Sequence, residues 1–523
     1  MVETQTGSTA AAEDAHIPAE VGATRRGGSR RRVLALASAL LAVAAITIAA
    51  LGLRGGHDLV PGPNVAITGA DPSAIIDANN SPTVAINPVD TRNLVVVDRL
   101  DRPGFSAALR WSRDAGASWT QTALPLPAGR DRPYAPDIAF DPAGILYVLY
   151  VNLEGSGNDP QTVWLSRSND GGRTLQAPVS VTGRLSFQAR LAVDGRGHVY
   201  VTWLHATEVG NLSIVGPAPV VLCATSSDGG ATFAAPVQVS DPPRQDIGAP
   251  VPIVDADGNV DVLYEDFNGD VRDFQSLDGP PWQKPFSLVV SRSTTQGKTF
   301  APGVVVDDGL VASDRFLVYL PRFNSIAAAP DHSLYVAWAD ARKGSDAVFL
   351  RRSTDGGQTW GAAVTVPSGA TGAGVSAWLP KVTVAPNGRV DVVFLAGQRG
   401  TGNGLVDAYL ASSDDSGSSF STARLSTASF NSRIGPETGP SFLAPDLGSR
   451  LGADSTDAAT VAVWTDTRQG TTDTGRQDID AATVDMPSTG VSTGRLVLVV
   501  VLLAGALAAA VPVLLGARAA RDA

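Results

Sequence analysis

The stretch STDGGQTW, residues 353–360, is one copy of an eight-residue pattern, Ser-x-Asp-x-Gly-x-x-aromatic, that decides the fold. Six copies begin at Ser112, Ser168, Ser226, Ser293, Ser353 and Ser413. Successive serines are 56, 58, 67, 60 and 60 residues apart. Such regular spacing indicates a repeated structural unit rather than a chance motif.

A second pattern precedes each copy. In residues 136–150, for example, a β-forming run, a Pro/Gly turn and a second run with Val and aromatics follow one another, which is typical of a hairpin. Another short run follows the eight-residue pattern, as in residues 362–366. Each unit therefore has four strands, with the pattern in its third turn. Four-stranded units of this length predict the blades of a β-propeller.

The eight-residue pattern has a structural role. Ser and Asp side chains hydrogen bond to the backbone of their own turn, Gly allows a positive φ, and the terminal aromatic buries apolar surface. Copy two ends in Leu175, and copy four has Thr295 in place of Asp. The remaining predicted structural residues are Asp114, Gly116, Trp119, Asp170, Gly172, Asp228, Gly230, Phe233, Gly297, Phe300, Asp355, Gly357, Trp360, Asp415, Gly417 and Phe420.

These repeats resemble the Asp-boxes, or bacterial neuraminidase (BNR) repeats, of exported bacterial proteins in the sialidase superfamily. The resemblance covers roughly residues 64–485 and implies an all-β propeller. It says little about activity, because one fold carries many functions.

The number of blades follows from the hairpins. They begin near Pro82, Pro136, Ala189, Pro250, Asn324, Pro380 and Arg450, which is seven against six Asp-boxes. The last unit stops one strand short, and an unassigned strand-like run, residues 64–68, precedes the first. We expect seven blades closed by that run, which hides the free edges; six blades, as in typical sialidases, is the alternative.

Two apolar stretches flank the repeats. Residues 33–53 and 496–517 carry no charge, and each is long enough to cross a bilayer as a helix. Five arginines precede the first and only Arg54 follows it, while Arg518 and Arg521 follow the second. This bias predicts cytoplasmic ends and an extracytoplasmic middle. The expected order is a disordered tail (1–32), a membrane helix or signal segment (33–53), the propeller (58–485), a linker (486–495), a membrane helix (496–517) and a short tail (518–523).

Two processing alternatives remain. Residues 29–34 resemble a twin-arginine export signal, which can be cleaved. Met486-Pro-Ser-Thr-Gly490 resembles a sortase sorting signal, although Leu usually stands first, so cell-wall anchoring is an alternative to a membrane helix.

Composition excludes several classes of protein. The net charge of −11 argues against nucleic-acid binding. The single cysteine, Cys223, lies in a predicted strand; it excludes an internal disulfide and is expected to be a buried, inert thiol. The five histidines are scattered, so neither a metal site nor a cofactor is predicted. The sequence makes no prediction of an oligomeric state.

Candidate ligand residues lie in the longest loops on the propeller face opposite the Asp-boxes. These rim residues are Arg132, Tyr134, Glu265, Asp266, Arg315, Tyr319 and Arg322. The resemblance implies an arginine triad for a sugar carboxylate, a Tyr nucleophile with a Glu, and an acid/base Asp. The expected Arg-Ile-Pro is missing before the first blade, so no catalytic position is assigned, although Tyr134 or Tyr319 could pair with Glu265.

Two other motifs have structural interpretations. Residues 255–261 (DADGNVD) look like a calcium loop, but they align with turns at 141–144 and 385–391 and are better explained as a repeated hairpin turn. Trp338-Ala-Asp340-Ala-Arg342 recurs at 464–468 and could grip an anion; a salt bridge that locks blades is favoured.

The sequence thus predicts a membrane-anchored, extracytoplasmic sialidase-like propeller that binds a glycan or another surface polymer. An exo-α-sialidase or related glycoside hydrolase is one alternative, and a non-catalytic protein-interaction scaffold is another.

Overall fold

The computed structural model of the chain describes residues of one compact unit, Gly56–Ser488. The described residues are 59–69, 75–155, 158–210, 213–215, 219–242, 244, 246–269, 285–311, 322–372, 374–399, 403–436 and 446–486. The predicted membrane segments, 33–53 and 496–517, fall outside these ranges. Within the ranges, the structure has no helix with the length and apolar character that a bilayer span requires.

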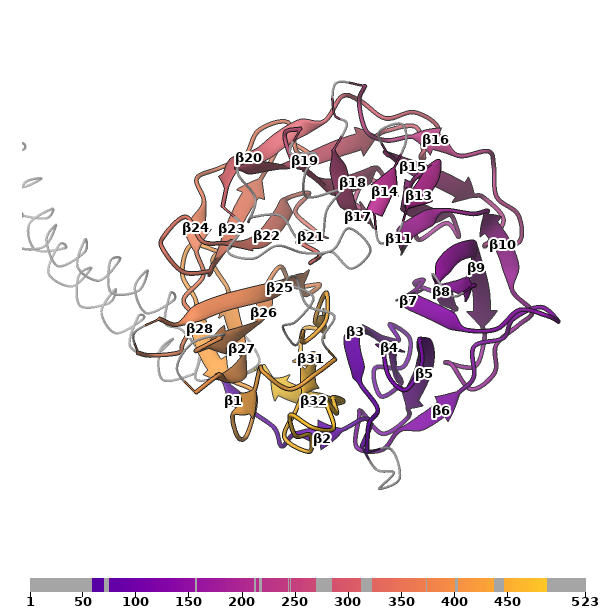
Figure 1. Cartoon of the computed structure of the whole chain (residues 1–523). Helices are drawn as coiled ribbons and strands as arrows, with labels where there is room; N and C mark the ends of the chain where they lie inside the picture. The colour runs from indigo at the N-terminus through magenta and orange to yellow at the C-terminus, as the bar shows by residue number, and fades with distance from the viewer. Residues whose placement is uncertain are drawn as a thin grey trace, which may run out of the picture. The chain divides into compact units, whose positions relative to one another are not determined.

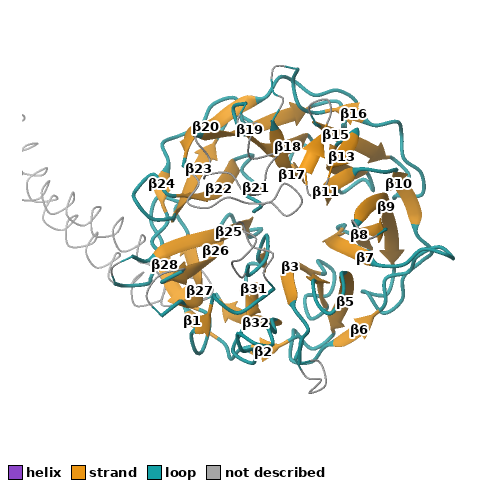
Figure 2. Ribbon diagram, in the orientation of Figure 1, coloured by secondary structure: helices purple, strands orange, loops and turns teal. Residues whose placement is uncertain are grey.

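The unit is a seven-bladed propeller whose blades are antiparallel sheets arranged around a centre (Figure 1), and its described elements are strands, loops and turns (Figure 2). Blade 1 comprises β3 (Asn79–Ile86), β4 (Leu94–Leu100), β5 (Ser106–Ser112) and β6 (Thr120–Thr122). Blade 2 comprises β7 (Pro133–Phe140), β8 (Leu146–Glu154), β9 (Asp159–Ser168) and β10 (Val179–Thr182). Blade 3 comprises β11 (Ser186–Val193), β12 (Val199–His205), β15 (Val220–Ser226) and β16 (Val237–Gln238), with a separate hairpin of β13 (Glu208–Gly210) and β14 (Ser213–Val215).

The remaining blades repeat this order. Blade 4 comprises β17 (Ile247–Val254), β18 (Val260–Asp266), β19 (Phe286–Ser293) and β20 (Val304–Leu310). Blade 5 comprises β21 (Ser325–Ala328), β22 (Leu334–Asp340), β23 (Ala347–Ser353) and β24 (Val364–Thr365). Blade 6 comprises β25 (Ser376–Val384), β26 (Val390–Gly397), β27 (Leu405–Ser413) and β28 (Ser421–Arg424), and β29 (Phe430–Asn431) also pairs with β27. Blade 7 comprises β30 (Gly452–Ser455), β31 (Ala459–Asp466) and β32 (Asp478–Asp485).

Blade 7 is completed by the start of the propeller, as the sequence predicts. The short strands β1 (Val60–Pro61) and β2 (Val65–Ala66) both pair antiparallel with β32, with Val60 opposite Asp485 and Ala66 opposite Asp480. Chain segments more than 400 residues apart therefore share one sheet. This closure confirms seven blades and excludes the six-bladed alternative.

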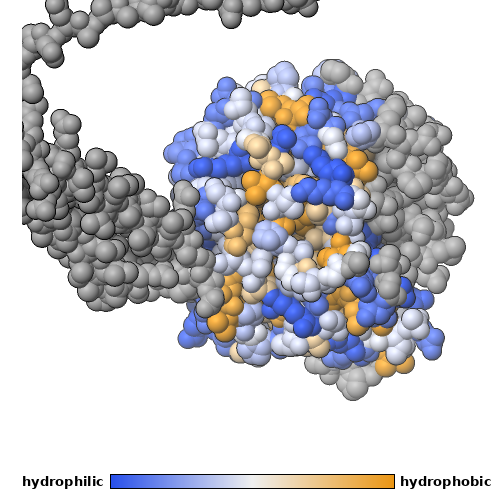
Figure 3. Space-filling view, turned by 90° about the vertical axis from the view of Figure 1, so that its left-hand side faces the viewer, coloured by the Kyte–Doolittle hydropathy of each residue, from blue (hydrophilic) through white to orange (hydrophobic). Residues whose placement is uncertain are grey.

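The hydrophobic core lies between neighbouring blades. Val95 and Val97 of β4, for example, pack in one cluster with Leu146, Val148 and Tyr150 of β8. The second strands are buried on both faces, which explains why they read as continuous apolar runs rather than as alternating ones. On the side of the unit seen in Figure 3, hydrophobic and hydrophilic residues are interspersed.

The Ser-x-Asp-x-Gly turns are held by a repeated set of hydrogen bonds. Ser353 Oγ donates to Asp355 Oδ1 (2.8 Å) and accepts from Gly357 N (2.9 Å). Asp355 accepts from both N (2.9 Å) and Oγ1 (2.5 Å) of Thr359. These bonds hold the pKa of Asp355 at about 2. The turns at Asp114, Asp170, Asp228 and Asp415 repeat the arrangement, with a Ser or Thr hydroxyl at the seventh position.

The hairpin turn at residues 255–259 is confirmed as a structural repeat. Asp255 Oδ1 accepts from the amides of Asp257 (2.9 Å) and Asn259 (2.8 Å). Asp141 makes the same two bonds in blade 2. Arg292 pairs with both Asp255 and Asp261, so these carboxylates are already occupied by a cation.

Six of the seven first strands have a residue with positive φ near their start. A non-glycine residue with positive φ causes a register shift in five of them, and Gly448 (φ 99°) precedes the sixth. The five residues are Ser81, Ala135, Gln188, Ala249 and Leu379. Two positions later stand the equivalent residues Thr83, Asp137, Arg190, Val251, Lys381 and Arg450.

Candidate functional site

The upper face is the end of the propeller formed by the loops between second and third strands and the loops between blades. Arg99 lies at the end of β4, Asp101 follows it, and Tyr134 is near the start of β7. Tyr134 OH donates to Asp101 Oδ1 (2.6 Å), and Arg99 Nε donates to Asp101 Oδ2 (3.2 Å). The Arg99 guanidinium carbon lies 5.9 Å from the centre of the Tyr134 ring. We call these three residues the upper-face cluster.

The upper-face cluster is buried, but one of its hydrogen-bond donors has no acceptor among the described residues. Arg99 is 3% exposed and Tyr134 is 7% exposed. Arg99 Nη1 donates to Ser449 Oγ (3.1 Å), whereas buried Arg99 Nη2 has no hydrogen-bond partner among the described residues. Burial raises the pKa of Tyr134 well above its usual value, so the phenol is protonated and Asp101 is its acceptor.

A further carboxylate, Asp446 in the loop before β30, lies within electrostatic range of three arginines. Burial raises the pKa of Asp446, while the charges of Arg322, Arg99 and Arg399 lower it in part. These arginines belong to blades 5, 1 and 6. Arg399 also lies 5.1 Å from the Trp378 ring and donates to Asp346 (3.4 Å). The charges of three arginines from different parts of the chain therefore act on one carboxylate at the upper face.

An aromatic surface lies next to the upper-face cluster. The rings of Phe105 and Tyr134 meet edge to face, with centroids 5.3 Å apart. Phe105 is half-buried, so part of its ring reaches solvent beside the Tyr134–Asp101 pair. A charged cluster with an adjacent aromatic face is suited to a ligand that has both an anionic group and an apolar face.

The structure places the predicted rim residues in different surroundings. Tyr134 and Arg322 contribute to the upper face as described. Arg132 instead donates to Asn158 (2.7 Å) and to the carbonyl of Gly155 (3.2 Å), both in its own blade. Asp266 pairs with Arg244 (2.6 Å). Arg315 and Tyr319 lie outside the described residues.

Glu265 is the most perturbed of the predicted residues. It is buried at the end of β18, and its Oε1 accepts from Asn324 Nδ2 (2.5 Å). Its Oε2 has no partner among the described residues, and burial raises its pKa to about 8. The contacts of Glu265 are thus with Asn324, and those of Tyr134 with Asp101 and Arg99. The structure therefore pairs Tyr134 with an aspartate rather than with Glu265.

Sequence reasoning missed Arg99, Asp101 and Asp446. It searched the longest loops, whereas Arg99 and Asp101 sit at the short connection between β4 and β5. The signal available was their position at the end of a second strand, which is the same place that Glu265 and Asp266 occupy in blade 4.

The two Trp-x-Asp-x-Arg segments bridge neighbouring blades, which confirms the favoured interpretation. Arg342 Nε donates to both oxygens of Asp340, and Arg342 Nη2 reaches Asp307 of blade 4 (2.8 Å). Arg468 in turn binds Asp466 and Asp480. It also donates to Thr427 of the preceding blade (3.0 Å) and to Asn64 of the closing segment (3.2 Å).

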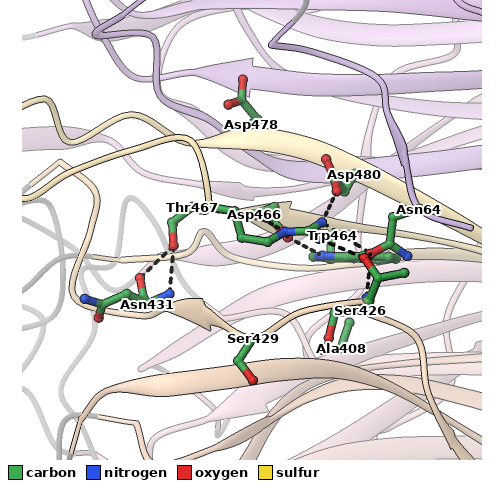
Figure 4. Close-up of polar contacts among 12 residues, drawn as sticks. Asn64, Ala408, Ser426, Ser429, Asn431, Trp464, Asp466, Thr467, Asp478 and Asp480 are labelled. Atoms are coloured by element: carbon green, nitrogen blue, oxygen red, sulfur yellow. Dashed lines mark hydrogen bonds and ion pairs between the residues drawn. The ribbon is translucent and has the colours of Figure 1, made fainter.

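A pocket of about 300 Å³ opens beside Arg468. Figure 4 labels four of its lining residues, Asn64, Asp466, Asp478 and Asp480. Its lining is polar and consists of Asn64, Ala66, Thr427, Asp466, Arg468, Gln469, Asp478 and Asp480. Burial and the neighbouring charge of Asp466 raise the pKa of Asp480 to about 7. The lining carboxylates are bonded to neighbouring residues, since Asp478 accepts from Thr68 (3.0 Å) and pairs with Arg476 (2.9 Å).

Comparisons with known proteins give likenesses of fold at low identity. No protein-family model matches the chain, and no curated protein matches it. A protein of unknown function from Dyadobacter fermentans is 13% identical, with a TM-score of 0.46 over 82% of this chain and 99% of its own. A Hadza microbial sialidase, Hz136, is 16% identical, with a TM-score of 0.42 over 75% and 76%. The endosialidase of phage phi92 is 10% identical, with a TM-score of 0.46 over 82% and 69%. At these values the likenesses assign no activity to the chain.

Proposed function

We propose that this protein is a membrane-anchored, extracytoplasmic propeller that binds a carboxylate-bearing glycan at its upper face. The observation that carries the proposal is the arrangement of Arg99. Its guanidinium is 3% exposed, and its Nη2 has no partner in the described part of the chain, while Arg322 and Arg399 approach the same region through Asp446. A buried guanidinium with a free N–H is costly unless an acceptor arrives, and carboxylates are its best-matched acceptors.

The surroundings fit a sugar rather than a simple ion. Phe105 offers a partly exposed ring next to Tyr134, against which the apolar face of a pyranose can lie. Asn80 donates to Asp101 (2.8 Å) and to Gln477 (3.3 Å), and both side chains are buried, so they hold Asp101 in place beneath this surface.

Binding is tested by isothermal titration of the full-length chain with polygalacturonate, with polysialic acid and with neutral dextran. We expect saturable binding of an acidic polymer and none of dextran. Arg322→Met should weaken binding about tenfold or more, as loss of a charge-assisted hydrogen bond of about 1.5–3 kcal/mol predicts. Arg92→Met, an exposed arginine in a turn of blade 1, is the matched control with the same change of charge. Equal affinity for dextran and the acidic polymers would refute the proposal.

The Tyr134–Asp101 hydrogen bond of 2.6 Å favours a second candidate, a glycoside hydrolase. A neutral phenol needs a base to act as a nucleophile, and Asp101 is placed to take its proton. The test is release of 4-methylumbelliferone from its α-N-acetylneuraminide. Turnover that is lost in Tyr134→Phe, with glycan binding kept, would identify an enzyme; no turnover in the wild-type chain leaves the binding function alone.

The location outside the membrane has its own test. Cys223 is the chain's single cysteine and is 1% exposed, so it gives little background with thiol reagents. Gln358 is exposed in a turn of blade 5, and the variant Gln358→Cys places a second, accessible thiol there. A membrane-impermeant maleimide should label this variant, and not the wild type, on intact cells. Labelling only after lysis would place the propeller inside.

A further inference from the structure

A second group of charged residues, none of them in the upper-face cluster, comes from the first strands of four blades or the residues just before them, and one of them, Arg450, is within electrostatic range of Arg99 and Tyr134. Asp137 of blade 2, Arg190 of blade 3, Lys381 of blade 6 and Arg450 of blade 7 occupy the equivalent positions that follow the positive-φ residues. The strands that carry three of them, β7, β11 and β25, lie closest to the centre in Figure 1. We call these four residues the central ring.

The two arginines of the ring converge on the same neighbours. The guanidinium carbons of Arg190 and Arg450 lie 5.1 and 5.9 Å from the centroid of one ring, that of Phe323. Arg450 Nη2 donates to the carbonyl of Pro136 (2.6 Å), and Arg190 Nε lies 3.2 Å from Asp137 Oδ2. Both cations therefore reach residues 136–137 of blade 2 from different blades.

Lys381 approaches the same charges from the opposite side of the propeller. The charges of Arg190 and Arg450 disfavour its ammonium form, while Asp137 and Asp454 favour it. Blades 6 and 2 are not neighbours, so Lys381 and Asp137 act on each other through the centre.

The ring carries more positive than negative charge. Three cations, Arg190, Lys381 and Arg450, face two carboxylates, Asp137 and Asp454, which is a surplus of one. Asp454 is also bonded to the backbone, because its oxygens accept from the amides of Ile86 (2.8 Å) and Ser455 (2.9 Å). Arg190 is 9% exposed, and its Nη1 has no hydrogen-bond partner in the described part of the chain.

We propose that the central ring binds a small anion, of the size of chloride or acetate, between Arg190, Lys381 and Arg450. Buried cations in excess of their carboxylates need a counter-charge, and an anion here would ligate groups from three blades at once. It would accept from Arg190 Nη1 and from the Lys381 ammonium. This site does not depend on the glycan-binding function proposed above, since the residues of the two differ.

The test uses bromide as a heavy analogue of chloride. Crystals of the full-length chain soaked in bromide should show an anomalous peak among Arg190, Lys381 and Arg450. In solution at constant ionic strength, replacing gluconate with chloride should raise the melting temperature progressively, because a ligand of the native state stabilises it. Gluconate, a much larger anion than chloride, is the reference salt.

Two variants make the solution test specific. In Lys381→Met, at least ten times more chloride should be needed for the same rise in melting temperature. Lys298→Met, with the same change of charge in an exposed turn, should respond like the wild type. An equal response of Lys381→Met and wild type would overturn the proposal. If Lys381→Met does not fold, the bromide experiment on the wild-type chain decides, and the lack of a peak at the ring refutes it.

Discussion

Phe349 and Asp480 occupy the same position in two blades, each as the cross-strand partner of the tryptophan in a Trp-x-Asp-x-Arg segment. In blade 5 the ring of Phe349 stacks on Trp338 (5.6 Å) and supports Arg342 (5.1 Å). In blade 7 Asp480 takes that place and lines the pocket instead. The exchange gives Arg468 a second carboxylate partner, beside Asp466, in the blade that the N-terminal strands close.

This exchange predicts a pH dependence of stability. The pKa of Asp480 is raised to about 7, and Asp466, Asp478 and Arg468 are the charged groups that act on it. The folded chain thus holds this proton more tightly than the unfolded chain, so the stabilisation is complete below pH 4 and is lost as the pH rises to 7. Asp480→Asn should remove that part of the pH slope, on the order of 1–2 kcal/mol between pH 4 and 7.

The measurement is urea unfolding of wild type and Asp480→Asn at several pH values. The quantity to compare is the difference between the two curves, because Asp98 and Asp261 also have raised pKa values, of about 6 and about 7. Parallel curves between pH 4 and 7 would show that Asp480 does not titrate in this window.

The imperfect fourth turn offers a stabilising substitution. Thr295 stands where the other turns have Asp, and its Oγ1 contacts only the hydroxyl (2.8 Å), amide (3.0 Å) and carbonyl (3.3 Å) of Thr299 and the hydroxyl of Ser293 (3.3 Å). Thr295→Asp would supply the second acceptor oxygen that Asp355 provides in blade 5. We expect a gain of roughly 0.5–1 kcal/mol above pH 5, measured by thermal unfolding. A lower melting temperature at pH 7 would contradict the assignment of the turn.

The repeated turns made the fold predictable from the sequence, but they did not predict which residues meet in the upper-face cluster. Six turns with one spacing specify four-stranded units, and an unassigned run at residues 64–68 anticipates the closure, because an unpaired edge must be covered. Arg99 and Asp101 lie at the short connection between β4 and β5, Asp446 comes from the segment before β30, and no local pattern joins them. Their proximity is a product of ring closure, so it could be seen only once the blades were placed.

The sequence also contains a pattern from which the positions of the central ring could have been predicted. Four of the positive-φ residues are followed by Pro, as in Leu379-Pro380, and the next residue occupies the position that the ring members share. The prediction that hairpins begin near those prolines was correct. A regular strand, however, gives no reason to choose one of its residues as a member of a central site. The register shift supplies that reason.

Anion binding at the ring should weaken in alkaline solution. Burial, and then the charge of Arg190, lower the pKa of Lys381 to about 8, with Arg450 acting in the same sense and Asp137 and Asp454 in the opposite one. Deprotonation above pH 8 removes one of the three cations, so the chloride-dependent rise in melting temperature should fall several-fold between pH 7 and 9. In Lys381→Arg the rise should persist at pH 9; an equal loss in that variant would exclude Lys381 as the titrating group.

The buried thiol should report global unfolding. Cys223 in β15 is 1% exposed, and burial raises its pKa to about 12. Thiolate and access are both needed for reaction, so a disulfide reagent should modify the native chain only at the rate of unfolding. Asn64→Ala, which weakens the closure, should speed that reaction, and rapid modification of the native wild type would contradict the burial.

Asn64 is half-buried and connects the closing segment to two blades, so it should contribute strongly to stability. Its Nδ2 donates to the carbonyl of Leu425 (2.8 Å), and its Oδ1 accepts from Thr427 N (2.7 Å), Thr427 Oγ1 (2.9 Å) and Arg468 Nη2 (3.2 Å). Because β1 and β2 have two residues each, these bonds are a large share of what holds the segment. Asn64→Ala should cost about 1–3 kcal/mol in unfolding free energy. Asn403→Ala, which removes one exposed bond to Leu405 N, is the control and should cost a few tenths at most; equal losses in the two variants would mean that the ring is held closed by the strand pairing alone.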